Sequence, residues 1–158
     1  MRWAQLTLVE NDPAHYDLTF WLEYFKRIKA DGVCLSAGGC TAYYPTAIPY
    51  HHRSPWLGDG DPLSDLIQGC RKLDMTVIVR TDPHAIRQEA ADAHPEWIAC
   101  DAQGKPRRHW AMPEMWVSCV LGPYNFDFMT AVHREIMQRY QVEGIFGNRW
   151  ASGEQSKR

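Results

Sequence analysis

The amino-acid sequence predicts an α/β fold built from parallel βα units. One local pattern occurs three times: a helix ends in basic residues, a short turn holds an acidic residue, and an apolar strand begins. Its copies lie at residues 29–33, 71–75 and 139–144. Short helix-to-strand turns and nearly continuous apolar strands are typical of right-handed βα units in a parallel sheet. The strand-to-helix connections are much longer, which marks the carboxyl ends of the strands as the functional face.

Four short apolar runs are the predicted strands of this sheet. They lie at residues 6–9, 33–36, 75–79 and 144–147, and the third, which is β-branched and bounded by charge, is the clearest. We expect these strands to be parallel and to lie in sequence order, with the helices on the outside. Residues 97–100 also have the pattern of an extended segment.

Helices are predicted in the connections between these strands. Residues 18–28 place apolar side chains at helical spacing. Asp61 is expected to cap the next helix, with Pro62 at its first position. A short helix is expected from about residue 84 to residue 93, ahead of a proline. Asp127 is expected to cap the last helix, which continues to about residue 140.

Four strands are half the number in an eight-stranded (β/α) barrel, which usually takes about 250 residues. We therefore expect residues 1–150 to form the N-terminal half of such a barrel and residues 151–158 to be a frayed polar tail. Half a barrel leaves two unpaired strand edges and an apolar inner face. The sequence therefore favours a homo-oligomer, or pairing with a C-terminal half-barrel that is missing from this chain.

Composition and charge exclude several classes of protein. The 158 residues are 45% hydrophobic and 12% aromatic, which is enough to bury a core. A net charge of -2 without basic runs argues against nucleic-acid binding. No apolar run approaches the roughly 20 residues that span a bilayer, and the N-terminus has no signal-peptide core, so we expect no membrane partner and a cytoplasmic location. The five cysteines are odd in number and widely spaced, which predicts free thiols.

The end of the third strand is the strongest candidate site. Arg80, Asp82 and His84 occupy alternate positions, and alternate side chains of an extended segment point the same way. A cation, a carboxylate and an imidazole would then meet at the carboxyl ends of the strands. The alternative is an Arg–Asp ion pair in which Asp82 also caps the following helix ahead of Pro83.

The loops after the first two strands carry further polar and aromatic residues. The second loop suits a sugar, because the apolar face of a pyranose stacks on a ring while its hydroxyls need hydrogen-bonding partners. The alternative is that the aromatic rings only hold a long loop in place. The first loop is either a solvated turn with a helix cap or a contact to a polar ligand. These residues are Glu10, Asn11, Asp12 and His15 in the first loop, and Tyr43, Tyr44, Tyr50, His51, His52, Arg53 and Trp56 in the second.

Later segments add acidic and amide candidates. Glu96 and Glu114 are carboxylates in polar, aromatic surroundings. Asn148 follows the last predicted strand, where a carboxylate would have suggested a nucleophile. Asn cannot ionise, so we expect it to orient a ligand. No glycine-rich phosphate motif follows the first strand, and adjacent histidines alone do not form a metal site, so we expect no cofactor and no metal.

The sequence resembles the glycoside hydrolases described as hypothetical glycosyl hydrolase 6, which are related to β-galactosidase and α-L-fucosidase-like TIM barrels. An ordered set of short motifs over most of residues 1–150 carries the resemblance. The motifs are Tyr50-His51, residues 77–82 with Arg80, His94-Pro95-Glu96-Trp97 with Asp101 and Gly104, Cys119 ahead of Pro123-Tyr124, and residues 142–146 with Asn148-Arg149-Trp150.

The resemblance implies a barrel and a carbohydrate ligand at the carboxyl ends of the strands. Together with the patterns above, it gives two candidate catalytic carboxylates and a set of candidate sugar-binding residues. The candidate catalytic residues are Asp82 and Glu114, and the candidate sugar-binding residues are Tyr50, His51, Arg80, His84, His94, Trp97, Asn148, Arg149 and Trp150.

We therefore expect a glycoside hydrolase-like domain that acts on or binds a sugar but is incomplete as a catalyst. Hydrolysis of a glycosidic bond normally needs two carboxylates on opposite sides of that bond, and this chain offers at most one plausible member of such a pair. Two alternatives remain open. One is a half-barrel that binds carbohydrate without catalysis. The other is a metal-dependent hydrolase of the barrel class that uses His51, His52, His84 or His94.

Overall fold

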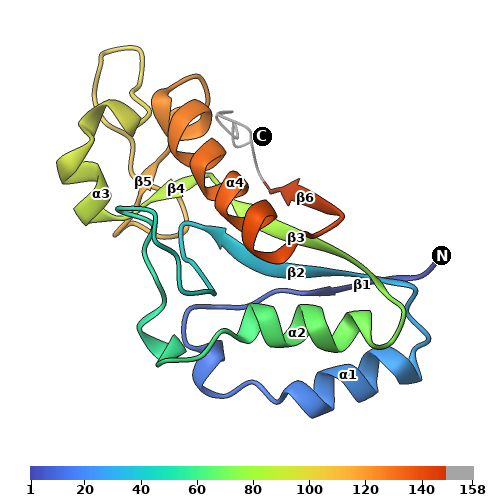
Figure 1. Ribbon diagram of the computed structural model, residues 1–158. Coiled ribbons are helices and arrows are strands. Elements are labelled where there is room, and N and C mark those ends of the chain that lie inside the picture. Colours follow the sequence, from blue (N-terminus) through green and yellow to red (C-terminus); the bar gives the residue numbers. More distant parts are fainter. Residues whose placement is uncertain (149–158) are drawn as a thin grey trace.

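A sheet of four parallel strands forms the frame of the fold. The computed structural model describes residues 1–148 and hydrogen-bonds the strands in the order β1-β2-β3-β6 (Figure 1). Every neighbouring pair is parallel, which confirms the predicted α/β class, strand order and strand direction. The predicted tail at residues 151–158 lies outside the described residues. The strands are β1 (Trp3–Leu6), β2 (Gly32–Gly39), β3 (Thr76–Asp82) and β6 (Gly144–Gly147).

The first strand begins and ends earlier than the sequence predicts. The prediction placed it at residues 6–9, whereas β1 ends at Leu6. At Leu8 the backbone N–H no longer donates to a neighbouring backbone but to the side-chain Oγ of Ser36, 3.0 Å away. The apolar residues after Leu6 therefore start the β1-to-α1 loop.

Three main helices follow the strands in the chain. They are α1 (Leu18–Arg27), α2 (Pro62–Arg71) and α4 (Met129–Tyr140). The predicted cap of α2 is confirmed, because the Asp61 carboxylate accepts a hydrogen bond from the Ser64 N–H. A cap of this kind contributes on the order of 1 kcal/mol to stability. The helices pack their apolar sides on the sheet and on one another.

The start of α4 differs from the prediction. The chain enters this helix through a π-helical segment, Tyr124–Phe128, and Phe128 stands at the cap position without a side-chain hydrogen bond. The expectation that Asp127 caps the helix is therefore wrong. The continuous helical turn already satisfies the first N–H groups of α4, so that no capping carboxylate is needed.

The three predicted helix-to-strand turns share one backbone feature. Lys29, Asp74 and Gln141 follow α1, α2 and α4, respectively, and each has a positive φ, at 54°, 55° and 51°. A left-handed residue commonly ends a helix because its N–H can bond a carbonyl of the last turn. The Gln141 N–H, for example, donates to the Met137 carbonyl. The repeated sequence pattern thus corresponds to a repeated turn geometry.

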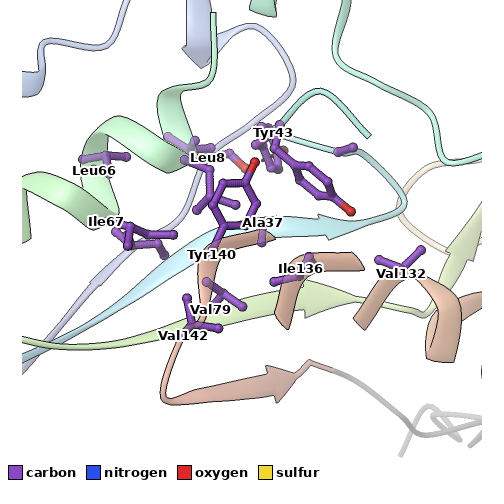
Figure 2. Packing of buried hydrophobic residues seen from close by; sticks show 14 of the residues in the cluster. Leu8, Ala37, Tyr43, Leu66, Ile67, Val79, Val132, Ile136, Tyr140 and Val142 are labelled. Atoms are coloured by element: carbon purple, nitrogen blue, oxygen red, sulfur yellow. Dashed lines mark hydrogen bonds between the residues drawn. The ribbon is translucent and has the colours of Figure 1, made fainter. Parts of the chain in front are cut away.

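The hydrophobic core lies between the sheet and the helices. Figure 2 shows Leu66 and Ile67 of α2 and Val132 and Ile136 of α4 around Val79 of β3. All five side chains are almost completely buried. Because residues from two helices and the sheet share one cluster, α2 and α4 cover the same face of the sheet.

The two faces of β3 differ in burial. Val77 and Val79 are completely buried under the helices, whereas the alternate residues Ile78, Arg80 and Asp82 are partly exposed. We call the side that carries Ile78, Arg80 and Asp82 the open face. Side chains alternate along a strand, so the same alternation that builds the core also turns the polar residues away from it.

The connection from β3 to α4 contains a small separate sheet. It includes β4 (Ala85–Ile86), α3 (Gln88–Ala93) and β5 (Trp116–Val117), and β4 pairs antiparallel with β5. The helix expected from residue 84 begins only at Gln88, because the preceding residues form β4. The segment at residues 97–100 is extended only in part, because Trp97 ends a 3-10 turn, while Ile98 and Cys100 form isolated bridges.

The cysteines and the helices of the described residues can be compared with the predictions made from composition. All five cysteines are free thiols, as expected. Within residues 1–148, no helix is both long enough and apolar enough to cross a membrane.

The edges of the sheet suggest self-association. β1 and β6 are its outer strands, and within the described part of the chain neither has a neighbour on its outer side. Trp3 and Phe146, at 47% and 46% exposure, lie on these two strands. Unpaired edges and exposed aromatic rings favour contact with another chain. We propose that the isolated 158-residue protein associates, which light scattering over a concentration series should detect. A stable monomer at high concentration would contradict this.

Candidate functional site

The strongest polar cluster lies around the Asp82 carboxylate at the carboxyl end of β3. Arg80 Nη2 donates to Asp82 Oδ1 at 2.8 Å, and Asn148 Nδ2 donates to the same oxygen at 2.6 Å. His84 Nδ1 lies 3.9 Å from that oxygen. The side chains of Arg80 and Asp82 are 17% and 18% exposed. We call these four residues the Asp82 cluster.

The strand geometry explains why these residues meet. Arg80 and Asp82 are two positions apart on β3, so both project to the open face. Asn148 follows β6, and its backbone N–H donates to the Thr81 carbonyl at 2.8 Å, which continues the pairing of the two strands. Its side chain therefore arrives beside Asp82. Four candidate residues from the sequence thus gather in one place.

The alternative interpretation of Asp82 is correct in one part and wrong in the other. Arg80 and Asp82 do form an ion pair. Asp82 does not cap the next helix, because α3 begins five residues later than Pro83, and Arg87 stands at its cap position. The Asp82 carboxylate is instead directed to Arg80 and Asn148.

A second charged cluster joins the loops that follow β1, β2 and β3. Glu10 Oε1 contacts His52 Nε2 at 2.5 Å and Arg87 Nη2 at 2.9 Å. Arg87 also donates through Nε to the Cys40 carbonyl at 3.2 Å. Burial raises the pKa of Glu10, but the hydrogen bonds and positive charges of His52 and Arg87 outweigh it, and the net pKa is lowered. The carboxylate is therefore held in its charged form.

Cys40 connects the two clusters, because its backbone is hydrogen-bonded to a residue of each. The Cys40 N–H donates to the Asp82 carbonyl at 3.0 Å, while its own carbonyl accepts from Arg87. Burial, and secondarily the charge of Asp82, raise the pKa of the Cys40 thiol to about 11. Sequence reasoning missed Arg87, because no strand or helix period relates it to the other polar residues. The sequence offered Glu10 either as part of a solvated turn or as a contact to a polar ligand, and not as a partner of His52 and Arg87.

His51 lies away from the Asp82 cluster, in the layer between the sheet and α4. Its ring is 4% exposed and packs against the rings of Tyr44 and Phe128. Nε2 accepts from the Gly39 N–H at 3.1 Å, and Nδ1 lies 3.2 Å from Thr46 Oγ1. Both ring nitrogens are thus used by the protein itself. His51, a candidate sugar-binding residue from the sequence, therefore lies on the helix side of the sheet and not beside the Asp82 carboxylate.

Glu135 of α4 completes this network. Its carboxylate accepts hydrogen bonds at 2.7 Å from the hydroxyls of Tyr44 and Thr46 and from the Ala47 N–H. Burial by itself raises the pKa of Glu135. These three hydrogen bonds lower the pKa by more than burial raises it, so the net pKa is below its ordinary value. The network fixes the loop after β2 to α4, which agrees with the alternative that aromatic residues hold this loop in place for one of them, Tyr44.

Three other candidate residues form an aromatic stack. The His94 ring lies parallel to Trp97 with centroids 4.0 Å apart, and Tyr50 packs edge-on against His94 at 5.0 Å. Trp97 is buried, whereas Tyr50 is 44% exposed. His94 Nδ1 also lies 3.0 Å from the Glu96 carboxylate. None of the contacts described for these rings reaches Asp82, so the stack is a separate group.

Glu114 does not join the Asp82 cluster among residues 1–148. Glu114 is exposed, and its backbone carbonyl accepts a hydrogen bond from Arg108. Arg149 and Trp150 lie outside the described residues.

Among residues 1–148 there is no metal-binding cluster, and the surface hollows described below lie away from Asp82. Across residues 1–148, no three His, Cys, Asp or Glu side chains converge closely enough to hold a metal ion. Among residues 1–148, the surface is hollowed beside β1, with a volume of about 450 Å³, and between α1 and α2, with a volume of about 280 Å³. Neither is lined by Asp82, so the cluster is part of the open face rather than of these hollows.

The burial of His51 predicts a specific pH dependence of stability. Burial lowers the pKa of His51 to about 4, against 6.5 for an ordinary histidine. Between pH 6.5 and pH 4, His51 is protonated in the unfolded chain and neutral in the folded chain. The free energy of unfolding therefore falls as pH drops from 6.5 to 4. The loss from this group is on the order of 2–3 kcal/mol.

Denaturant unfolding at several pH values would test this expectation. The variant His51→Gln should lose less stability than the wild-type protein over the same range. His133, whose pKa is also lowered by burial, is present in both proteins and cancels in the comparison. Equal pH slopes for the two proteins would contradict the assignment to His51.

Solved structures of carbohydrate enzymes share this fold at low sequence identity. The chain is similar to α-L-fucosidase isoenzyme 2 from Paenibacillus thiaminolyticus, with a TM-score of 0.73 and 20% identity over 93% of this chain and 23% of that one. A noncanonic maltogenic α-amylase, AmyB, from Thermotoga neapolitana has a TM-score of 0.60 and 16% identity over 92% of this chain and 38% of that one. The chain thus spans less than two fifths of either enzyme.

A third similar structure is a hypothetical protein from Ruminiclostridium thermocellum, with a TM-score of 0.68 and 10% identity over 94% of this chain and 75% of that one. At such identities these likenesses show the fold alone. No curated protein matches the chain. Residues 18–149 match the model of one family over most of the chain's length. The chain therefore belongs to the family described as hypothetical glycosyl hydrolase 6.

Proposed function

We propose that this chain is a glycoside hydrolase-like, carbohydrate-active domain that binds a sugar at the carboxyl ends of β3 and β6. One observation carries the proposal: a partly buried carboxylate, Asp82, is held between a guanidinium and an amide on the open face. Carboxylate, guanidinium and amide groups are the fixed donors and acceptors that orient a polyhydroxylated ligand. The family and the similar fucosidase and amylase folds support the choice of a sugar.

Three residues of the Asp82 cluster have proposed roles. Among residues 1–148, the contacts of the Asp82 carboxylate with Arg80, Asn148 and His84 all involve Oδ1, and Oδ2 is the atom that would accept a sugar hydroxyl. Arg80 offers a planar fork of donors, of which Nη1 also reaches Thr7 Oγ1 at 3.1 Å. Asn148 would hold the carboxylate in position and fix the orientation of the ligand.

We further propose that the chain does not hydrolyse glycosides by itself. A glycosidase needs two carboxylates about 5–5.5 Å apart for retention or about 6.5–9.5 Å apart for inversion. At the end of β6, beside Asp82, the residue is Asn148, which cannot act as an acid or a nucleophile. Glu114, the other candidate, is exposed and makes no side-chain hydrogen bond or ion pair with the cluster among residues 1–148.

The variant Asp82→Asn tests the proposed binding site. Binding of α-L-fucose and of maltose would be measured by calorimetry. For the sugar that binds, the variant should raise Kd roughly 10-fold, because a charged acceptor is replaced by a neutral one. The melting temperature should change little, since the amide oxygen of Asn can still accept from Arg80 and Asn148.

The control variant is Glu23→Gln, which removes an exposed carboxylate of α1 far from the open face. It should leave both sugar affinity and stability unchanged. Unchanged affinity in Asp82→Asn would show that the sugar binds elsewhere. Turnover of nitrophenyl glycosides by the purified protein would contradict the proposed lack of catalysis and would direct attention to Glu96 and Glu114.

A further inference from the structure

The hollow beside β1 has the features of a ligand site that the proposed function does not use. Its volume of about 450 Å³ lies in the range of roughly 300–1,000 Å³ that is typical of ligand pockets. The end of β1, the loop after it and the first turn of α1 form its boundary. Aromatic, acidic and amide side chains therefore meet around one hollow.

Aromatic rings of α1 form one wall of this hollow. Phe20 is 52% exposed, and Trp21 beside it is half-buried. The centroids of these two rings are 5.3 Å apart and their planes meet at 81°, so they pack edge to face. Trp21 also packs against the buried ring of Phe25, at 6.0 Å. The core thus holds Trp21, and the wall is a fixed apolar surface of the kind that suits the C–H face of a sugar ring.

Two carboxylates among the lining residues give the hollow a negative charge. Asp12 Oδ2 accepts from the Val9 N–H at 2.7 Å, and Asp17 Oδ1 accepts from the Phe20 N–H at 3.0 Å, so both side chains are held by the backbone. Within residues 1–148, no hydrogen bond or ion pair engages the second oxygen of either carboxylate. The Asp17 charge exceeds the partial positive charge, about half an elementary charge, at the N-terminus of α1. No Lys or Arg lines the hollow, which therefore favours a cation.

The strand side of the hollow supplies neutral polar groups. Gln5 Nε2 donates to Thr7 Oγ1 at 2.8 Å, and both side chains belong to exposed residues. Arg80 Nη1 donates to the same hydroxyl oxygen at 3.1 Å, but the charge of Arg80 is paired with Asp82. The Gln5 amide oxygen is an acceptor for a hydroxyl group.

We propose that the hollow beside β1 binds a protonated amino sugar, such as D-glucosamine. This inference goes beyond the proposed function, because it concerns a site that does not include Asp82. The C–H face of the sugar ring packs on Phe20 and Trp21, and the ammonium group lies against Asp12 and Asp17. A cation close to an indole is also attracted to its electron-rich face. The hydroxyls of the sugar meet the polar groups of the strand side.

Titrations followed by ¹⁵N NMR test the proposal, with the Trp21 indole N–H signal as the reporter of the hollow. D-glucosamine is compared with D-glucose and with N-acetyl-D-glucosamine, neither of which carries a positive charge. Near neutral pH, where most of the amine is protonated, glucosamine should bind roughly 10-fold more tightly than either neutral sugar. This corresponds to about 3-fold for each carboxylate, as expected for partly exposed charge pairs.

Variants that remove charge but keep the backbone contacts identify the carboxylates. Asp17→Asn should reduce the preference for glucosamine about 3-fold, and it keeps the cap of α1 because Asn caps a helix as well as Asp does. Combining it with Asp12→Asn should abolish the preference. If the double variant has a lower melting temperature, the single variant decides. The control Glu23→Gln removes an exposed carboxylate of α1 that does not line the hollow, and it should keep the full preference.

Three results would overturn the inference. The first is an equal Kd for glucosamine and glucose at the Trp21 signal. The second is a preference that Asp17→Asn leaves unchanged. The third is the absence of any shift of the Trp21 signal with glucosamine. Each of them leaves the proposed function intact, because that function is tested separately with neutral sugars and Asp82→Asn.

Discussion

The close approach of β2 and β3 at Gly39 is the constraint on which the functional end of the sheet depends. Gly39 has a φ of 110°, and a Cβ built on it would lie 2.3 Å from the Asp82 carbonyl oxygen. Because glycine has no side chain, the backbones can meet, and the next residue, Cys40, donates its N–H to that same oxygen. The Gly39 N–H donates to His51. A single backbone position thus joins the Asp82 strand to the loop after β2.

The two faces of the sheet have different roles. The helix side supports the fold, and the open face carries the proposed binding site. On the helix side, His51, Thr46 and Glu135 form a chain of hydrogen bonds that ties the loop after β2 to α4. On the open face, Asp82 meets Arg80 and Asn148. In the first network, which is partly buried, the polar atoms of the protein bond one another. The second leaves a carboxylate partly exposed, which is the condition for meeting a ligand.

The position of a side chain could be predicted from the sequence where it follows from the alternation of side chains along a strand and from the order of the strands. Arg80 and Asp82 share a face because side chains alternate along a strand, and Asn148 joins them because neighbouring parallel strands end at the same edge. Contacts between distant segments could not be predicted in this way. His51 depends on Glu135, far along the chain, and its role as a buried support was therefore not visible from its neighbours in sequence. Likewise, the Asp82 cap failed because residues 85–86 form a strand, a choice made by pairing with residues 116–117 rather than by local propensity.

The central claim is that a sugar binds at the Asp82 cluster, and its most direct test is to map the contact by NMR. A ¹⁵N-labelled sample would be titrated with 4-nitrophenyl α-L-fucopyranoside and with maltose, and the amide and side-chain NH₂ signals followed. For the sugar that binds, the account predicts that the largest shifts occur at the Asn148 side-chain amide and at the backbone amides of Gly39, Cys40 and Arg80. Shifts confined to the hollow beside β1, around Tyr16 and Trp21, would contradict it.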